Sequence, residues 1–295
     1  MEILVAGGSG FLGAEITRVL AAGGHAVTVM SRSAPVAPIP GTSWVQGDVT
    51  DPESLVIPVS GKDIVVDAVQ VPNYPMEDPK RGYTFERIDF GGTKNLVDAA
   101  KAGGARQFIG LSGMGAAEDA PYHWLRFKWQ EEQYIAAAGI PFTIFRPSWI
   151  YGARDVSLNR FLGFARWLPF VPVVGDGKMR INPLYVGDLA AHVLAAVANE
   201  RAMGQVFELG GPRVMTMDDI IRTALRVTGK RRFLFHQPKP LMKAVATLAQ
   251  HVPGRPLTPD AIEFVTMEGV ADTALAESVF GLRLTSLDEA LRQYL

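Results

Sequence analysis

The stretch MEILVAGGSGFLG (residues 1–13) decides the fold class of this chain. An apolar run of strand type leads directly into three glycines at intervals of three, Gly7, Gly10 and Gly13, and a helical pattern over 11–24 follows. A glycine-rich turn between a strand and a helix is either a plain turn or a cradle for a dinucleotide pyrophosphate. In the cradle, the first glycine permits the turn, the second lets the pyrophosphate approach the backbone, and the third lets the helix pack closely.

The rest of the chain favours the cradle, because short apolar runs alternate with helical patterns. We expect strands at 2–8, 25–32, 42–49, 63–69, 106–112, 141–152 (with an exit loop) and 205–212, and helices at 11–24, 89–104, 121–139 and from near Asp188. Repeated strand–helix units predict a parallel sheet with helices on both faces. The predicted fold is therefore a Rossmann-type, doubly wound α/β sheet with a smaller, mainly helical C-terminal domain.

The rhythm of the sequence changes after residue 152 and predicts two domains. Residues 1–152, with returning segments at about 181–212, form the expected dinucleotide-binding domain. Residues 153–180 and 213–295 form the expected small domain for a substrate or a partner. Within it, the segment 240–254 is amphipathic, which is compatible with packing on the small domain, a lid, a partner surface or an interfacial membrane contact.

Composition excludes several functions. The 295 residues carry a net charge of −1 and no cysteine, so we expect no nucleic-acid partner, no disulfide and no thiol chemistry. No apolar run is long enough to span a bilayer, and no histidine pattern has metal-ligand spacing. A cytoplasmic protein without a metal site is the expectation.

The end of the second strand points to the cofactor. A site that prefers NAD places an acidic residue here to hold the ribose hydroxyls, but this chain has Ser31, Arg32 and Ser33. A guanidinium can instead pair with a 2′-phosphate. We therefore expect NADP(H) rather than NAD(H), although a solvated surface arginine remains the alternative.

Several motifs resemble the short-chain dehydrogenase/reductase superfamily. They are the glycine spacing at 7–13, GDVTD at 47–51 and RPSWIYG at 146–152. Two further motifs, GDGKMRINPLYVGDLA (175–190) and ELGGP (208–212), resemble its extended and atypical branch. The C-terminal pattern PLTPDAIEFVTMEGVAD…FGLRLTSLDEAL resembles the branch of the NADPH-binding accessory subunit of respiratory complex I and the NmrA-like proteins.

The resemblance implies a set of site residues on this chain. The cofactor-binding positions that it implies are Gly7, Ser9, Gly10, Phe11, Leu12, Gly13, Arg32, Asp48, Val49, Ala68, Val69, Lys128, Arg146, Pro147 and Ser148. Ser112 and Lys128 match catalytic positions, with Lys128 expected to bind the nicotinamide ribose. For Lys128 the alternative is a surface lysine, and for Ser112 it is turn chemistry.

The chain departs from the family at the position of the catalytic tyrosine. Active members place Tyr four residues before Lys on one helix, and here that residue is Trp124. Indole donates a hydrogen bond but is neither an acid nor a base near neutral pH. A substitute proton donor would be water, Ser112, His123 or Tyr151.

Two functions therefore remain open. The first is an NADP-dependent oxidoreductase that acts on an apolar carbonyl, a quinone or an activated double bond. The second is a catalytically silent NADPH-binding sensor or assembly protein that presents a surface to a protein partner. A sugar-nucleotide epimerase ranks lower, because it also needs the tyrosine.

Overall fold

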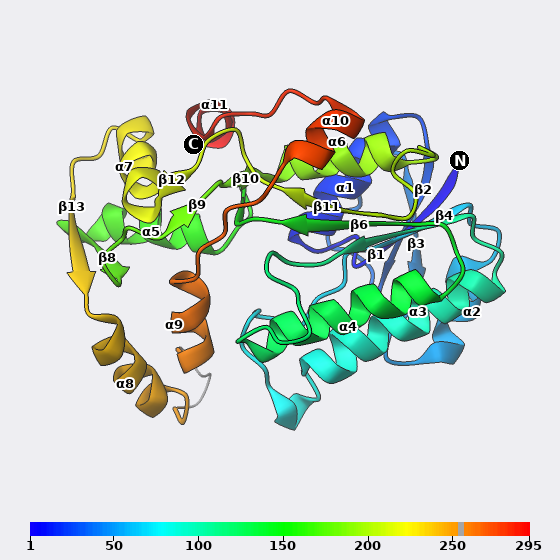
Figure 1. Ribbon diagram of the computed structural model, residues 1–295, viewed down its shortest axis with the longest axis horizontal. Helices are drawn as coiled ribbons and strands as arrows, with labels where there is room; N and C mark the ends of the chain where they lie inside the picture. Colours follow the sequence, from blue (N-terminus) through cyan, green and yellow to red (C-terminus); the bar gives the residue numbers. More distant parts are fainter. Residues whose placement is uncertain (253–256) are drawn as a thin grey trace.

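The computed structural model describes residues 1–252 and 257–295, and its centre is a seven-stranded parallel sheet (Figure 1). The strand order is β11-β6-β5-β4-β1-β2-β3. The strands are β1 (Glu2–Ala6), β2 (Ala26–Ser31), β3 (Thr42–Gln46), β4 (Ile64–Asp67), β5 (Gln107–Leu111), β6 (Phe142–Pro147) and β11 (Gln205–Leu209). The chain winds outward from β1 to β3 and then from β4 to β11, so the winding reverses between β1 and β4. Ligands of such sheets bind at this reversal, outside the carboxyl ends of the strands.

Helices cover both faces of the sheet because its central strands are apolar on both sides. On β1, Ile3 and Val5 pack with α1 (Phe11–Ala22) and α6 (Val186–Ala196) in one core. Leu4 and Ala6 pack into the opposite core, against α3 (Gly91–Ala102) and α4 (His123–Ala137). The helices of that second face are α2 (Val56–Val59), α3 and α4, together with the short η1 (Pro52–Leu55).

A C-terminal lobe, which comprises α5, β8, α7, β13, α8, α9 and α11, lies beside the carboxyl ends of the strands (Figure 1). Its elements are α5 (Ser157–Trp167), β8 (Phe170–Val174), α7 (Met217–Val227), β13 (Phe233–Gln237), α8 (Lys239–Ala249), α9 (Pro259–Val265) and α11 (Leu287–Tyr294). Its core unites α5, β8, α7 and α11. By contrast, α10 (Ala274–Phe280) packs on the Rossmann core, where the ring of Phe280 contacts Phe145 and Phe207.

Short strand pairs link the remaining segments. They are β7 (Ile150–Tyr151) with β10 (Leu184–Tyr185), β9 (Arg180–Ile181) with β12 (Met215–Thr216), and β8 with β13. The loop after β4 holds η2 (Pro79–Arg81) and a π-helical turn, η3 (Phe85–Phe90), that runs directly into α3.

The predicted fold class is confirmed, with local differences. The helix expected at 89–104 begins earlier, as η3. The pair β8–β13 was not expected, because its strands are short and lie in aromatic, proline-rich sequence. Residues 253–254 of the amphipathic segment 240–254 lie outside the described residues. Among the helices that the structure describes, none is long and apolar enough to cross a membrane.

Candidate cofactor and catalytic site

The glycine turn after β1 has the geometry of an anion cradle. Gly7 has φ +74°, and a Cβ there would lie 2.7 Å from the carbonyl oxygen of Ala68. A Cβ on Gly13 would overlap the carbonyl oxygen of Gly7, so the helix can approach the turn only with glycine at 13. Gly10 caps α1 without a side-chain hydrogen bond, and no acidic residue stands in the first turn. The backbone N–H groups at this helix end are therefore available to an anion.

The neighbouring turns bring the other expected residues to the same edge of the sheet. Ala68 and Val69 directly follow β4, and the backbone of both contacts Gly7. Asp48 follows β3, and its carboxylate accepts hydrogen bonds from the backbone N–H and the hydroxyl of Thr50. Val49 is buried, and its carbonyl accepts a hydrogen bond from the amide of an α3 asparagine. Asp48 therefore stabilises its own turn.

Arg32, at the end of β2, is exposed and has a neighbour that the sequence did not reveal. Its guanidinium lies 5.6 Å from the ring centroid of Tyr83, and Arg81 lies 4.8 Å from the same ring. The hydrogen bond from Arg32 and the charges of both arginines lower the pKa of Tyr83. The loop after β4 thus brings a second cation to the end of β2.

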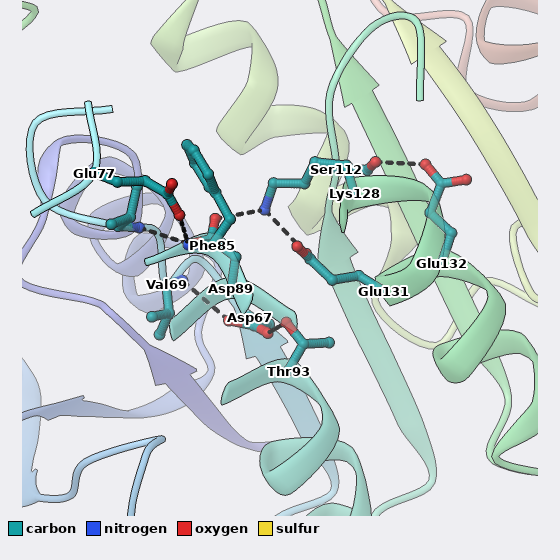
Figure 2. Close-up of polar contacts among 11 residues, drawn as sticks. Asp67, Val69, Glu77, Phe85, Asp89, Thr93, Ser112, Lys128, Glu131 and Glu132 are labelled. Carbon is teal, nitrogen blue, oxygen red and sulfur yellow. Dashed lines mark hydrogen bonds and ion pairs between the residues drawn. The ribbon is translucent and has the colours of Figure 1, made fainter. Parts of the chain in front are cut away.

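Lys128 is buried in a cluster of carboxylates, with 3% of its surface exposed (Figure 2). Its Nζ lies 3.0 Å from Oε2 of Glu131 on the same helix and 3.2 Å from Oδ1 of Asp89 on η3. Asp89 also accepts a hydrogen bond from the backbone N–H of Val71. The alternative of a surface lysine is therefore wrong, because two buried carboxylates hold the ammonium.

Burial dominates the electrostatics of this cluster. It raises the pKa of Asp89 and raises that of Glu131 to about 8, against the opposing charge of Lys128. Asp67, which ends β4 and accepts a hydrogen bond from the hydroxyl of Thr93, also has a raised pKa because of burial. Burial and the repulsion among these neighbouring carboxyls therefore favour their protonated forms.

Trp124 stands one turn before Lys128 and is 1% exposed. Its ring stacks on Tyr122 at 4.7 Å between centroids, and its Nε1 has no hydrogen-bond partner among the described residues. It belongs to an apolar cluster that includes Phe264 of α9 and Met267. His123 packs edge-on against Trp124, with its Nε2 3.5 Å from a carboxylate oxygen of Glu77.

Tyr74 is a candidate that the sequence analysis missed. Its ring packs edge-on against Phe85 and Phe264, at 5.5 Å and 5.2 Å between centroids. Burial raises its pKa, and the positive charge of Lys128 opposes that shift. A protonated phenol from the loop after β4 therefore lies within the electrostatic influence of the buried lysine. No periodic pattern marks Tyr74, because it lies in an irregular loop.

Ser112 and Arg146 share one carboxylate. The Ser112 hydroxyl donates to Oε1 of Glu132 at 2.5 Å, and Arg146 forms two hydrogen bonds to the same carboxylate, at 2.8 Å and 2.5 Å. After Pro147, the last residue of β6, the Ser148 hydroxyl donates to the carbonyl of Gly269. Glu132 therefore fixes the ends of β5 and β6 on α4, beside the cluster of Lys128 and Glu131.

The aromatic segment after β6 mostly packs into the core. Tyr151 is buried in the core of the lobe, where Trp149 and Phe161 pack against it. Trp167 is the exception and is 80% exposed. These rings therefore form the interior of the lobe rather than an open pocket, and Tyr151 is a buried core residue.

Comparison with known proteins agrees with this geometry. Residues 7–160 match a family model described as NAD(P)H-binding. The chain is 28% identical over 252 residues, 82% of its length, to NADH dehydrogenase (ubiquinone) 1 alpha subcomplex subunit 9, mitochondrial, of Arabidopsis thaliana, and covers 61% of that protein. It is 30% identical to the ceramide reductase of Caulobacter vibrioides over 81% of this chain and 74% of the relative.

Solved structures share the fold over the whole chain. The UDP-glucuronic acid 4-epimerase of Bacillus cereus aligns with a TM-score of 0.75 at 20% identity, over 100% of this chain and 98% of that one. The chain spans about half to three-fifths of the length of the first curated relatives that it matches. Together with the glycine cradle, these matches show that the chain belongs to the NAD(P)H-binding family of the short-chain dehydrogenase/reductase superfamily.

Proposed function

We propose that the protein binds NADP(H) and is an NADP-dependent oxidoreductase. The observation that carries the proposal is the glycine turn, whose Gly7 and Gly13 tolerate no side chain and whose helix end has no side-chain cap. The pyrophosphate would lie on the N-terminus of α1. Arg32 and Arg81, which share the Tyr83 ring, would pair with the 2′-phosphate.

The proposed substrate is an apolar carbonyl compound, a quinone or an activated double bond. The ceramide reductase relative supports an apolar substrate. A cavity of about 510 Å³ lies beside α9 and is lined in part by Val174, Met179 and Pro238. Thr266, just after α9, also lines this cavity, while Phe264 of the same helix contacts Tyr74. The cavity is also lined by Asp176, His236 and Lys239, so it offers polar groups beside an apolar wall, as sites for such substrates do.

The chain's own residues supply binding and a proton in this proposal. When bound, the cofactor supplies the hydride. Lys128 has three N–H donors, of which two face Glu131 and Asp89, so the third can bind a ribose hydroxyl. Tyr74 replaces the missing phenol as proton donor in this proposal. Burial keeps the phenol protonated at neutral pH, and the charge of Lys128 offsets part of the cost that burial, Asp89 and Glu131 impose on the phenolate.

A second candidate is a silent NADPH-binding subunit. It is favoured by the packing of Trp124 with Phe264 and Met267, which fills the usual catalytic position. The relative that is a subunit of NADH dehydrogenase supports a protein partner.

The experiment measures NADPH consumption by the purified protein with a panel of quinones, enones and aldehydes. Multiple turnovers that fall by about a hundredfold in Tyr74→Phe, with NADPH binding unchanged, would support the reductase. Tyr122→Phe is the matched control, since its hydroxyl donates to Glu263 on α9. Tight binding without turnover would overturn the reductase and favour the silent subunit. Turnover that survives in Tyr74→Phe would overturn the role of Tyr74 alone.

A further inference from the structure

Two segments of the C-terminal lobe carry a concentration of positive charge that the net charge of the whole chain does not reveal. Residues 153–180 and 213–252 contain thirteen lysines and arginines but only four acidic residues, although the whole chain has a net charge of −1. Between 220 and 252 there is no acidic residue at all. These two segments are therefore strongly basic, and the acidic residues of the chain lie elsewhere, including on α9 and α11 of the same lobe.

The four acidic residues of these segments are already engaged. Asp155 accepts from the backbone N–H of Leu158, and Asp176 accepts from that of Lys178. Asp219 caps α7. Asp218 lies 2.8 Å from His236 and 3.0 Å from an arginine one turn along α7. Of the thirteen cations, Arg222 pairs with Asp218, and carboxylates of the segment 257–295 pair with Arg180, Arg226, Lys239 and Lys243. The other eight form no ion pair with a described residue.

Apolar side chains are exposed beside these cations. On α8 and just beyond it, Leu241, Val245, Leu248 and Val252 follow the spacing of one helix face, and all four are exposed. Leu248 is 75% exposed. The other side of α8 is held on the lobe, because Lys239 and Lys243 both pair with Glu263 of α9. The helix is thus attached by its charged side and presents its apolar side outward.

The strand before α8 continues the apolar surface. Phe233 and Phe235 of β13 are exposed, and both rings pack on Phe170 of β8 at 5.6 Å between centroids. Three residues before Phe170, Trp167 projects with Arg166 at 5.3 Å from its ring. In Figure 1, β13 leads into α8 along one edge of the lobe, and β8 lies beside β13.

Unpaired cations lie along the same edge. In the described part of the chain, no carboxylate lies within ion-pair distance of Arg166, Lys230, Arg231 or Arg232. Arg232 instead donates to the carbonyl of Ala165, which ties the turn before β13 to the end of α5. We call this surface, made of Arg166, Trp167, Lys230, Arg231, Phe233, Phe235, Leu241, Val245, Leu248 and Val252, the outer edge.

We propose that the outer edge docks on an anionic lipid surface. An apolar stripe enters the acyl boundary, aromatic rings lie at the headgroup level, and flanking lysines and arginines pair with lipid phosphates. A second copy of the chain fits worse, because a two-fold contact would bring these unpaired cations against their own copies. The inference concerns peripheral attachment and does not depend on the proposed reaction.

The test is co-sedimentation of the whole protein with vesicles. The probes are phosphatidylcholine alone and phosphatidylcholine with roughly one-third phosphatidylglycerol. We expect binding only to the anionic vesicles, a loss of binding at about 0.5 M salt, and a blue shift of tryptophan fluorescence that Trp167→Phe removes. Equal binding to both vesicles, or no binding, would overturn the proposal.

Matched variants test whether the outer edge, rather than any exposed apolar residue, binds the vesicles. Leu248→Glu should weaken binding about tenfold or more, and the triple variant Arg166→Gln, Lys230→Gln, Arg231→Gln about a hundredfold. Ile57→Glu is the control, because Ile57 of α2 is 79% exposed but lies on the Rossmann domain. Circular dichroism checks that each variant folds.

Other outcomes identify another occupant. Equal loss in Ile57→Glu and Leu248→Glu would overturn the assignment to the outer edge. A dimer in solution that Leu248→Glu dissociates would show that a second copy covers the edge. Salt-sensitive capture of an acidic protein without vesicle binding would assign the edge to a protein partner.

Discussion

The glycine turn after β1 and the face of α4 that carries Lys128 both belong to the Rossmann domain, but they differ in the groups that they offer to a ligand. The turn keeps its glycines and its uncapped helix end. The α4 face carries Trp124 four residues before Lys128, and two buried carboxylates hold the ammonium of that lysine. Pyrophosphate binding uses backbone groups and depends on glycine, whereas proton transfer uses side chains that a few substitutions change. Cofactor binding and catalysis can therefore diverge separately within one domain.

Gly13→Ala is expected to have the largest effect, because the new Cβ would overlap the carbonyl oxygen of Gly7. The turn must then move, so NADPH binding should weaken by more than about a hundredfold and unfolding should cost about 3 kcal/mol less. Titration calorimetry and urea unfolding measure both. Gly163→Ala is the control, since a Cβ there meets no atom within 4 Å. Normal NADPH binding by Gly13→Ala would show that the glycine turn does not hold the cofactor.

Lys128→Met tests the α4 face. The change leaves Asp89 and Glu131 buried without their cation, so the free energy of unfolding should fall by about 3 kcal/mol. Lys101→Met, on the exposed side of α3, should change it by less than about 0.5 kcal/mol. Equal stability of the two variants in urea would show that the cluster contributes nothing to folding.

The pH dependence of stability tests the raised pKa of Glu131. The folded protein holds a proton that the unfolded chain loses near pH 4.5, since the folded pKa is about 8. Stability from this group is therefore complete below about pH 4.5 and declines as the pH rises to about 8. The decline should be smaller in Glu131→Gln. Parallel profiles of unfolding free energy for the two proteins would contradict the assignment.

Arg32→Ala tests whether the end of β2 selects NADPH over NADH. NADPH affinity should fall about ten- to a hundredfold and NADH affinity less than about threefold, because only NADPH has the 2′-phosphate. Arg81→Ala should show the same preference with a smaller loss. Arg106→Ala should leave both affinities unchanged, as it precedes β5 and pairs with Asp63. Equal losses for both cofactors in Arg32→Ala would refute the 2′-phosphate assignment.

Trp124→Tyr has the smallest expected effect on activity. The new phenol would lie in the cluster that contains Tyr122 and Phe264, so turnover should change by less than about twofold. Assays with the quinone, enone and aldehyde panel measure it. A gain of broad carbonyl reductase activity would show that the α4 face lacks only the tyrosine of the usual catalytic arrangement.

The sequence by itself determined the sheet and the cradle. Alternation of apolar runs and helical patterns is a local property, and so is the need for glycine at Gly7, Gly10 and Gly13. The helical pattern at 121–139 also placed Trp124 and Lys128 on one helix, and their spacing of four residues placed them on one face. The preference for NADP(H) was predicted from one arginine and stays a prediction.

Only the tertiary structure decided what surrounds these residues. Asp89 reaches Lys128 from η3, Arg81 joins Arg32 through Tyr83, and Phe264 covers Tyr74 from α9. These partners come from distant segments without a shared pattern, and burial then raises the pKa values of the carboxyls that they bring together. The sequence analysis kept a surface lysine as the alternative for Lys128, since charge alone does not reveal which side of a helix is buried.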